Sequence, residues 1–217
     1  MKRIALFSAM ALSIGLMGCA SNGGGMASAG EDASTYMTKS FKEVIATSFQ
    51  AKGSAGLDRL VQTEAQHECS KYDYLGKPLP KDIAARIEKD HYSKVVYPAD
   101  GQYFGDWKAG LKIAEDGKGM TWNDKPGTPN GGNCINCHQM IPNNPSQGNL
   151  GPSLIGYGKT RGNSEQIVKY TWARIYDSTS FNACSQMPPL GASHALTQQQ
   201  MKDIMALLFD PNSPVNK

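Results

Sequence analysis

The chain has 217 residues, a length that accommodates one domain with an extension or two small domains. Its formal charge of +3 includes Lys2 and Arg3, and without these two residues 20 basic side chains face 19 acidic ones, a net charge of +1. A charge so close to neutral gives no support for a nucleic-acid-binding surface.

The N-terminus has the pattern of a secretory signal. Lys2 and Arg3 precede an apolar run over positions 4–17 that is too short to span a bilayer. The run ends in Leu-Met-Gly-Cys at positions 16–19, which resembles the lipobox of bacterial lipoproteins. We therefore predict a signal peptide over residues 1–18, lipidation of Cys19 and a flexible, lipid-anchored tether over 19–35 in the periplasm. Ordinary cleavage nearby is the alternative.

Three helical patterns follow, over residues 39–50, 57–69 and 81–94. We assign residues 36–99 to a helical extension that packs against the remainder of the chain. Because His67 and His91 lie among polar helical residues, we expect them to be surface side chains rather than metal ligands.

The remaining residues, 100–217, contain three stronger helical patterns. The first covers 107–115, and the second covers 164–177. The last begins at Thr197, where Gln200 completes a capping box, and it ends before Pro211. These patterns predict an all-α fold.

Residues 134–138 read Cys-Ile-Asn-Cys-His, the pattern of covalent c-type haem attachment. Two thiols on one helical turn can react with the two vinyl groups of a haem while the next residue reaches the iron. A thioredoxin-like redox pair would need a βαβ context, and a zinc site would need a second Cys or His pair; neither is visible. We predict one haem c attached to Cys134 and Cys137, with His138 as an axial iron ligand.

The sixth iron ligand has several candidates. Met187 precedes two prolines in a loop, which holds it extended on a stiff backbone. His194 and an open coordination position are the alternatives. Met140 is too close to the motif in sequence, and Met201 and Met205 lie on an apolar helical stripe, which predicts core packing.

Two cysteines remain, Cys69 and Cys184. In an oxidising compartment such a pair most often forms a disulfide, which would attach the extension to the loop of Met187. The alternative is that Cys184, three residues before Met187, is a reactive free thiol.

The loop after His138 ends in Gly-Pro-Ser-Leu at positions 151–154. It resembles the loop of class I cytochromes c in which a proline carbonyl holds the second nitrogen of the haem histidine. The resemblance implies that Pro152 holds His138 and that residues 100–217 adopt the class I cytochrome c fold; a plain turn is the alternative.

Three stretches together resemble the SoxX family, the monohaem c-type cytochrome subunits of SoxAX thiosulfate-oxidising complexes. They are residues 97–110, 131–139 and 182–189, and the likeness runs from about residue 69 to the C-terminus. The resemblance implies His138 and Met187 as axial ligands and a heterodimer with the SoxA cytochrome. In that family the pair acts as an L-cysteine S-thiosulfotransferase, with the reactive cysteine on SoxA, and joins thiosulfate oxidatively to a cysteine of the SoxYZ carrier protein. The electrons pass to a soluble cytochrome.

Two other functions stay open. One is a stand-alone, lipid-anchored electron carrier between a quinol-oxidising complex and a terminal oxidase. The other is a domain of a cytochrome-linked dehydrogenase, which would need a catalytic module that no segment of the sequence supplies.

Overall fold

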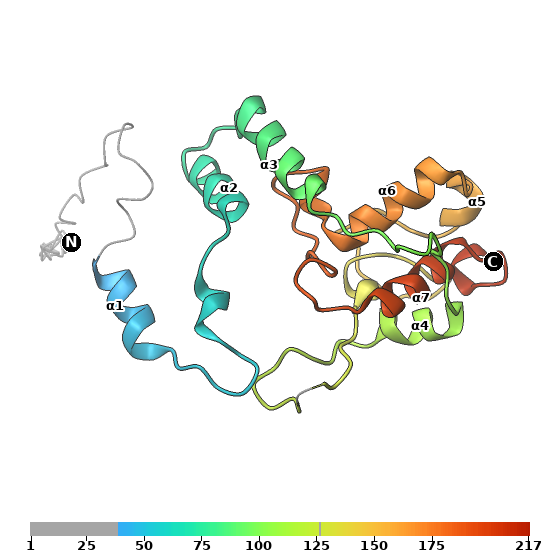
Figure 1. Cartoon of the computed structure of the whole chain (residues 1–217), viewed down its shortest axis with the longest axis horizontal. Helices are drawn as coiled ribbons and strands as arrows, with labels where there is room; N and C mark the ends of the chain where they lie inside the picture. Colours follow the sequence, from blue (N-terminus) through green and yellow to red (C-terminus); the bar gives the residue numbers. More distant parts are fainter. Residues whose placement is uncertain (1–38, 126) are drawn as a thin grey trace, which may run out of the picture. The chain divides into compact units, whose positions relative to one another are not determined.

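The computed structural model describes residues 39–125 and 127–217 (Figure 1). The predicted signal peptide, Cys19 and the predicted tether lie outside the described residues. Within those residues all regular elements are helical, apart from one isolated β-bridge between Lys52 and Ala55. The all-α prediction is therefore confirmed for this part of the chain.

The α-helices in chain order are α1 (Lys39–Ser48), α2 (Glu64–Tyr74), α3 (Lys81–Ser93), α4 (Trp107–Glu115), α5 (Tyr157–Arg161), α6 (Glu165–Tyr176) and α7 (Gln198–Phe209). Short 3-10 turns lie between or after them: η2 (Leu57–Leu60), η3 (Cys134–Asn136), η4 (Ser178–Ser180) and η5 (Pro214–Asn216). Helices α4, α6 and α7 form where the hydrophobic periodicity predicts them.

Side-chain caps define where these three helices begin. Asp106 accepts a hydrogen bond from the Lys108 backbone N–H at the start of α4, and Ser164 caps α6. Thr197 and Gln200 form the predicted capping box of α7. The helix boundaries thus follow from local sequence.

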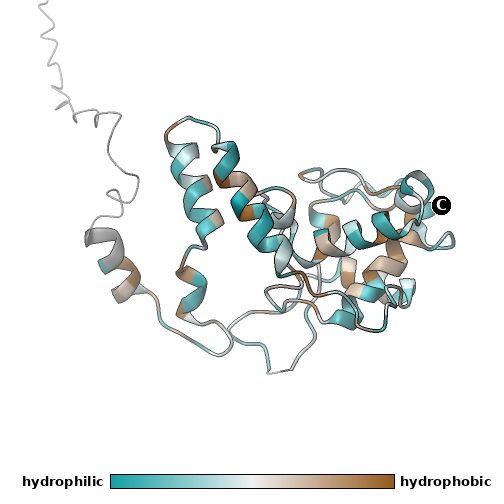
Figure 2. Ribbon diagram, turned by 45° about the horizontal axis from the view of Figure 1, so that its top comes forward, coloured by the Kyte–Doolittle hydropathy of each residue, from teal (hydrophilic) through white to brown (hydrophobic). Residues whose placement is uncertain are grey.

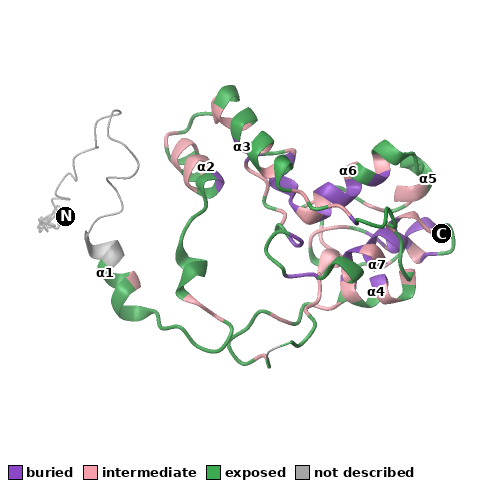
Figure 3. Cartoon of the chain, in the orientation of Figure 1, coloured by how far each residue is buried: buried purple, intermediate pink, exposed green. Residues whose placement is uncertain are grey.

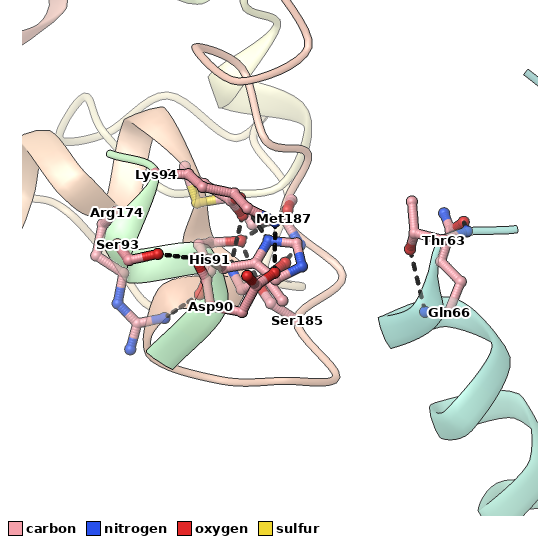
Figure 4. Close-up of polar contacts among 12 residues, drawn as sticks. Thr63, Gln66, Asp90, His91, Ser93, Lys94, Arg174, Ser185 and Met187 are labelled. Carbon is pink, nitrogen blue, oxygen red and sulfur yellow. Dashed lines mark hydrogen bonds and ion pairs between the residues drawn. The ribbon is translucent and has the colours of Figure 1, made fainter. Parts of the chain in front are cut away.

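The prediction of a single helix over residues 57–69 is wrong. The chain forms the short turn η2, becomes extended, and starts α2 only at Glu64. The reason is a second capping box, in which Thr63 and Gln66 satisfy each other's backbone N–H groups; Figure 4 shows one of these hydrogen bonds. The apolar spacing continues across residues 57–69 and therefore does not reveal this break between the two helical segments.

The main hydrophobic core is formed by α4, α6 and α7. Figure 2 shows hydrophobic positions grouped on the helices near the C-terminus, and Figure 3 shows buried residues along α6 and α7. The largest side chains buried in this core are Trp172, Met140, Met201, Met205 and Leu207. Helices α4 and α7 touch at Gly110, where an added Cβ would lie 2.1 Å from the backbone oxygen of Asp203. Only a glycine allows the two helices to approach this closely.

The extension packs on the segment that follows α6. Ile87 of α3 is 2% exposed and lies in a small apolar cluster with Ala65 of α2 and Ala183. The indole N–H of Trp172 donates to the carbonyl oxygen of Val96 at 2.9 Å, which joins the chain after α3 to the main core. In contrast, the described side chains of α1 are largely exposed (Figure 3).

Candidate functional site

An apolar cavity lies between the Cys-x-x-Cys-His segment and helices α6 and α7. Its volume is about 40 Å³. The cavity is lined by Cys134, His138, Met140, Leu154, Ile175, Met187, Leu190, Ile204 and Leu208. Three of the residues selected from sequence, Cys134, His138 and Met187, are therefore brought to one site.

The two motif cysteines are presented by a single turn. Asn133 adopts a left-handed conformation (φ 49°), which asparagine tolerates better than most residues, and η3 begins directly after it. The backbone N–H of His138 donates to the carbonyl oxygen of Cys134 at 2.9 Å, which closes the turn. Both cysteines are free thiols, and burial raises the pKa of Cys134 to about 11, so this thiol is protonated at neutral pH.

The His138 ring is oriented by the loop that follows it. Its Nδ1 lies 2.8 Å from the carbonyl oxygen of Pro152, and because a carbonyl only accepts, Nδ1 carries the proton. The lone pair is then on Nε2. Gly151 lies against the same ring, since a Cβ there would stand 2.3 Å from Cε1. The loop thus contacts the His138 ring through both Gly151 and Pro152.

The other candidates for iron ligation differ in their burial and in their distance from the cavity. Met187 is partly buried against the main core and lines the cavity, whereas His194 is exposed. Met201 and Met205 are 1% and 0% exposed, in agreement with core packing. Met140, set aside on sequence distance, also lines the cavity. Two thioethers are therefore available at this site.

A disulfide joins Cys69 of α2 to Cys184, with their Cα atoms 5.6 Å apart. It connects residues 115 positions apart and attaches the extension to the loop that carries Met187. In this structure Cys184 is not a free thiol.

No protein-family model matches this chain. A curated relative from Aquifex aeolicus (strain VF5), described as "Uncharacterized lipoprotein", is 37% identical over 159 residues, which is 72% of this chain and 73% of the relative. The chain belongs to the family of that lipoprotein. The relative is described as a lipoprotein, which is also the class of protein that the lipobox at Cys19 predicts for this chain.

The side chains that this lipoprotein-family chain presents at the cavity fit a covalently attached haem. Such a group needs two thiols on one turn, an imidazole with a free lone pair and apolar surroundings. The turn at η3 presents both thiols, of which Cys134 lines the cavity, His138 supplies the imidazole, and the lining of the cavity is apolar. Among the described residues there is no group of three or more His, Cys, Asp or Glu side chains arranged to hold a metal ion. A haem iron needs only two protein ligands, because the porphyrin supplies the other four.

Sequence reasoning missed several residues at the site. Ile204 and Leu208 lie on the same helix as Met201 and Met205, and they form part of the cavity wall. Ile175 and Leu190 reach the cavity from α6 and from the loop after Met187. The helical spacing of Ile175, Ile204 and Leu208 indicates a buried face, but no local pattern distinguishes contact with a cavity from contact with other side chains. In the described ranges no helix is long and apolar enough to cross a membrane.

Proposed function

We propose that this chain is a monohaem c-type cytochrome of the class I fold that serves as the electron-transfer subunit of a SoxAX-type complex. The observation that supports this most is that Cys134, His138 and Met187 line one apolar cavity. A haem bound there would take up and release one electron at a time.

Each residue has a defined role in this proposal. Cys134 and Cys137 would form the covalent bonds that hold a haem, and Nε2 of His138 would bind its iron. The Pro152 carbonyl, 2.8 Å from Nδ1, keeps the ring in one tautomer and orientation. The thioether of Met187 is the second axial ligand, and a soft sulfur ligand favours ferrous iron and raises the reduction potential. With both axial positions filled by the protein, the site transfers electrons and binds no substrate.

The SoxAX assignment rests on the three stretches that resemble SoxX. Joining thiosulfate to a thiol releases two electrons, and one haem accepts one, so a second redox centre has to share the reaction. In this proposal SoxA contributes that centre and the reactive cysteine, and SoxYZ contributes the thiol to be modified. The chain is then the electron-accepting subunit of an L-cysteine S-thiosulfotransferase and delivers electrons to a soluble cytochrome.

The lipobox and the lipoprotein relative favour a lipid anchor on Cys19 at the periplasmic side of a membrane. The same observations support a second candidate function, a stand-alone, lipid-anchored carrier that feeds a terminal oxidase. Such a carrier needs only the haem site and the tether.

Purification of the native protein from its own cells tests the proposal. We expect one covalent haem on this chain and a second haem protein in fixed ratio. When a thiol carrier protein is supplied, thiosulfate should reduce the haem. A single haem chain that exchanges electrons quickly without responding to thiosulfate would favour the stand-alone carrier. A chain without covalent haem would refute both functions.

A further inference from the structure

The backbone of Met187 is held on both sides by serine hydroxyls. The Ser178 hydroxyl donates to the carbonyl oxygen of Met187 at 2.8 Å, and the backbone N–H of Met187 donates to Ser185 Oγ at 3.2 Å. The two hydroxyls lie 2.7 Å apart. Because Ser178 has one hydroxyl proton and gives it to Met187, the hydrogen bond between the serines uses the proton of Ser185. The three residues form a closed ring of hydrogen bonds.

Ser178 is itself fixed by the turn that it begins. It is 1% exposed and is the first residue of η4. Asp177 caps this turn by accepting from the Thr179 backbone N–H at 3.0 Å with Oδ1. The position of the Ser178 hydroxyl therefore depends on how the Asp177 carboxylate is held.

The other oxygen of that carboxylate is bound by the extension. Nδ1 of His91 in α3 lies 2.6 Å from Asp177 Oδ2, and the Asp177 side chain is 6% exposed. The His91 side chain is 25% exposed, so it is partly buried at the surface and its ring is engaged by Asp177. Polar neighbours in sequence concealed this, because the partner of His91 is 86 residues away along the chain.

Two more bonds from the extension reach the same loop beyond η4. Glu88 of α3 accepts a hydrogen bond from the Ala183 backbone N–H at 3.1 Å, and Cys69 of α2 forms the disulfide with Cys184. Together with His91, these residues hold the loop before Met187 at three points. The extension thus fixes the segment from η4 to Cys184, and the serines fix Met187 within it.

We infer that Ser178 and Ser185 are positioning residues for the Met187 thioether and that the extension, through His91 and Asp177, maintains their geometry. This inference rests on the proposed function, because it concerns the axial ligand of that site. It assigns a purpose to the extension, which keeps the sixth ligand in place so that the iron exchanges electrons without binding other molecules.

The test measures methionine ligation directly. Two signals are recorded for each variant. The first is the weak long-wavelength absorption of ferric haem with a methionine ligand, and the second is the binding of carbon monoxide to the ferrous protein. For Ser178→Ala and for Ser185→Ala we expect weaker long-wavelength absorption and roughly a 3- to 10-fold gain in carbon monoxide affinity, the size expected from one lost hydrogen bond. Ser185→Thr retains the hydroxyl and should resemble the wild-type protein. His91→Leu should shift both signals in the same direction.

Two variants serve as matched controls. Ser213 is fully buried and donates to the Leu207 carbonyl oxygen at 2.7 Å, far along the chain from Met187, so Ser213→Ala removes an equivalent bond elsewhere. Arg86→Leu removes the ion pair with Glu64 within the extension. Both should leave the two signals unchanged.

Hydrogen exchange of the Met187 amide gives a readout that needs no haem. In the haem-free chain, Ser185→Ala should accelerate this exchange, and Ser213→Ala should not. Wild-type ligation signals in Ser178→Ala and Ser185→Ala would overturn the inference and leave the proposed function intact. A wild-type protein with attached haem but no methionine absorption would refute the Met187 assignment and this inference together.

Discussion

The backbone of Gly151 lies against the imidazole ring of His138, so that a Cβ at position 151 would come within 2.3 Å of Cε1 and 2.6 Å of Nδ1. Gly151 is not in the left-handed region, so the contact with the ring, and not backbone strain, is what demands glycine there. The same loop supplies the Pro152 carbonyl that holds Nδ1. One short segment therefore sets both the distance and the orientation of the ring.

We predict that Gly151→Ala disturbs the proposed ligation of a haem by His138. The added methyl group forces the ring to move and breaks its hydrogen bond to Pro152. The absorption spectrum and the reduction potential should both change, whereas Leu150→Ala, at an adjacent side chain that is 86% exposed, should alter neither. Wild-type values for Gly151→Ala would show that the ring does not need this contact.

Two methionines line the cavity, and substitution distinguishes their roles. Met187→Leu should abolish the long-wavelength absorption and allow carbon monoxide to bind, because a leucine has no sulfur lone pair. Met140→Leu preserves volume at a position that is 1% exposed and should retain the absorption, with a loss of stability below about 1.5 kcal/mol. The reverse result would make Met140 the axial ligand.

The raised pKa of Cys134 predicts a pH dependence for the haem-free chain. Burial favours the protonated thiol in the folded state, raising its pKa from 9.0 to about 11. The folded state therefore retains this proton where the unfolded state loses it, and the free energy of unfolding should fall as the pH rises from about 9 to about 11. Denaturant unfolding of the wild type and of Cys134→Ala across this interval tests the point, since the variant should show a weaker decline. An identical decline in both would contradict the assignment.

Removal of the Cys69–Cys184 disulfide should loosen Met187. The bond closes a long loop, so the double variant Cys69→Ser/Cys184→Ser should lose about 2–4 kcal/mol in the free energy of unfolding, together with part of the methionine absorption. The disulfide lines an open pocket of about 360 Å³, so a small reductant can reach it and reproduce the spectral change. Thiol labelling of the denatured holoprotein should find these two thiols only after reduction. Labelling of either one without reduction would rule the disulfide out.

Gly110 should control the contact between α4 and α7. Gly110→Ala places a methyl group 2.1 Å from the Asp203 backbone oxygen and forces the helices apart, which should cost about 1–3 kcal/mol. Lys112→Ala, at an exposed position of α4, is the control in the same denaturant titration and should change stability little. Equal stabilities for the two variants would mean that the helices adjust without strain.

Local signals predicted the helices well where capping and periodicity agree, as at Thr197 and Gln200. The helix prediction failed where a cap interrupts an apolar pattern, as at Thr63, although the capping box of Thr63 and Gln66 can be recognised in the sequence. Helix α5 was missed because it is five residues long and is held by distant contacts. The Asn216 side chain accepts hydrogen bonds from the backbone N–H groups of Gly158 and Lys159 across more than fifty positions of sequence.

The sequence by itself determined the helical class, the spacing of Cys134, Cys137 and His138, and the choice of Met187 as a ligand candidate, because each depends on residues close together along the chain. Only the tertiary structure placed Met187 and Met140 at the cavity with the motif and connected His91, through Asp177 and Ser178, to the Met187 backbone. Those relationships join residues that are far apart in sequence. They arise only when burial of the apolar faces brings the helices together, and no local pattern encodes the partner that a polar side chain then meets.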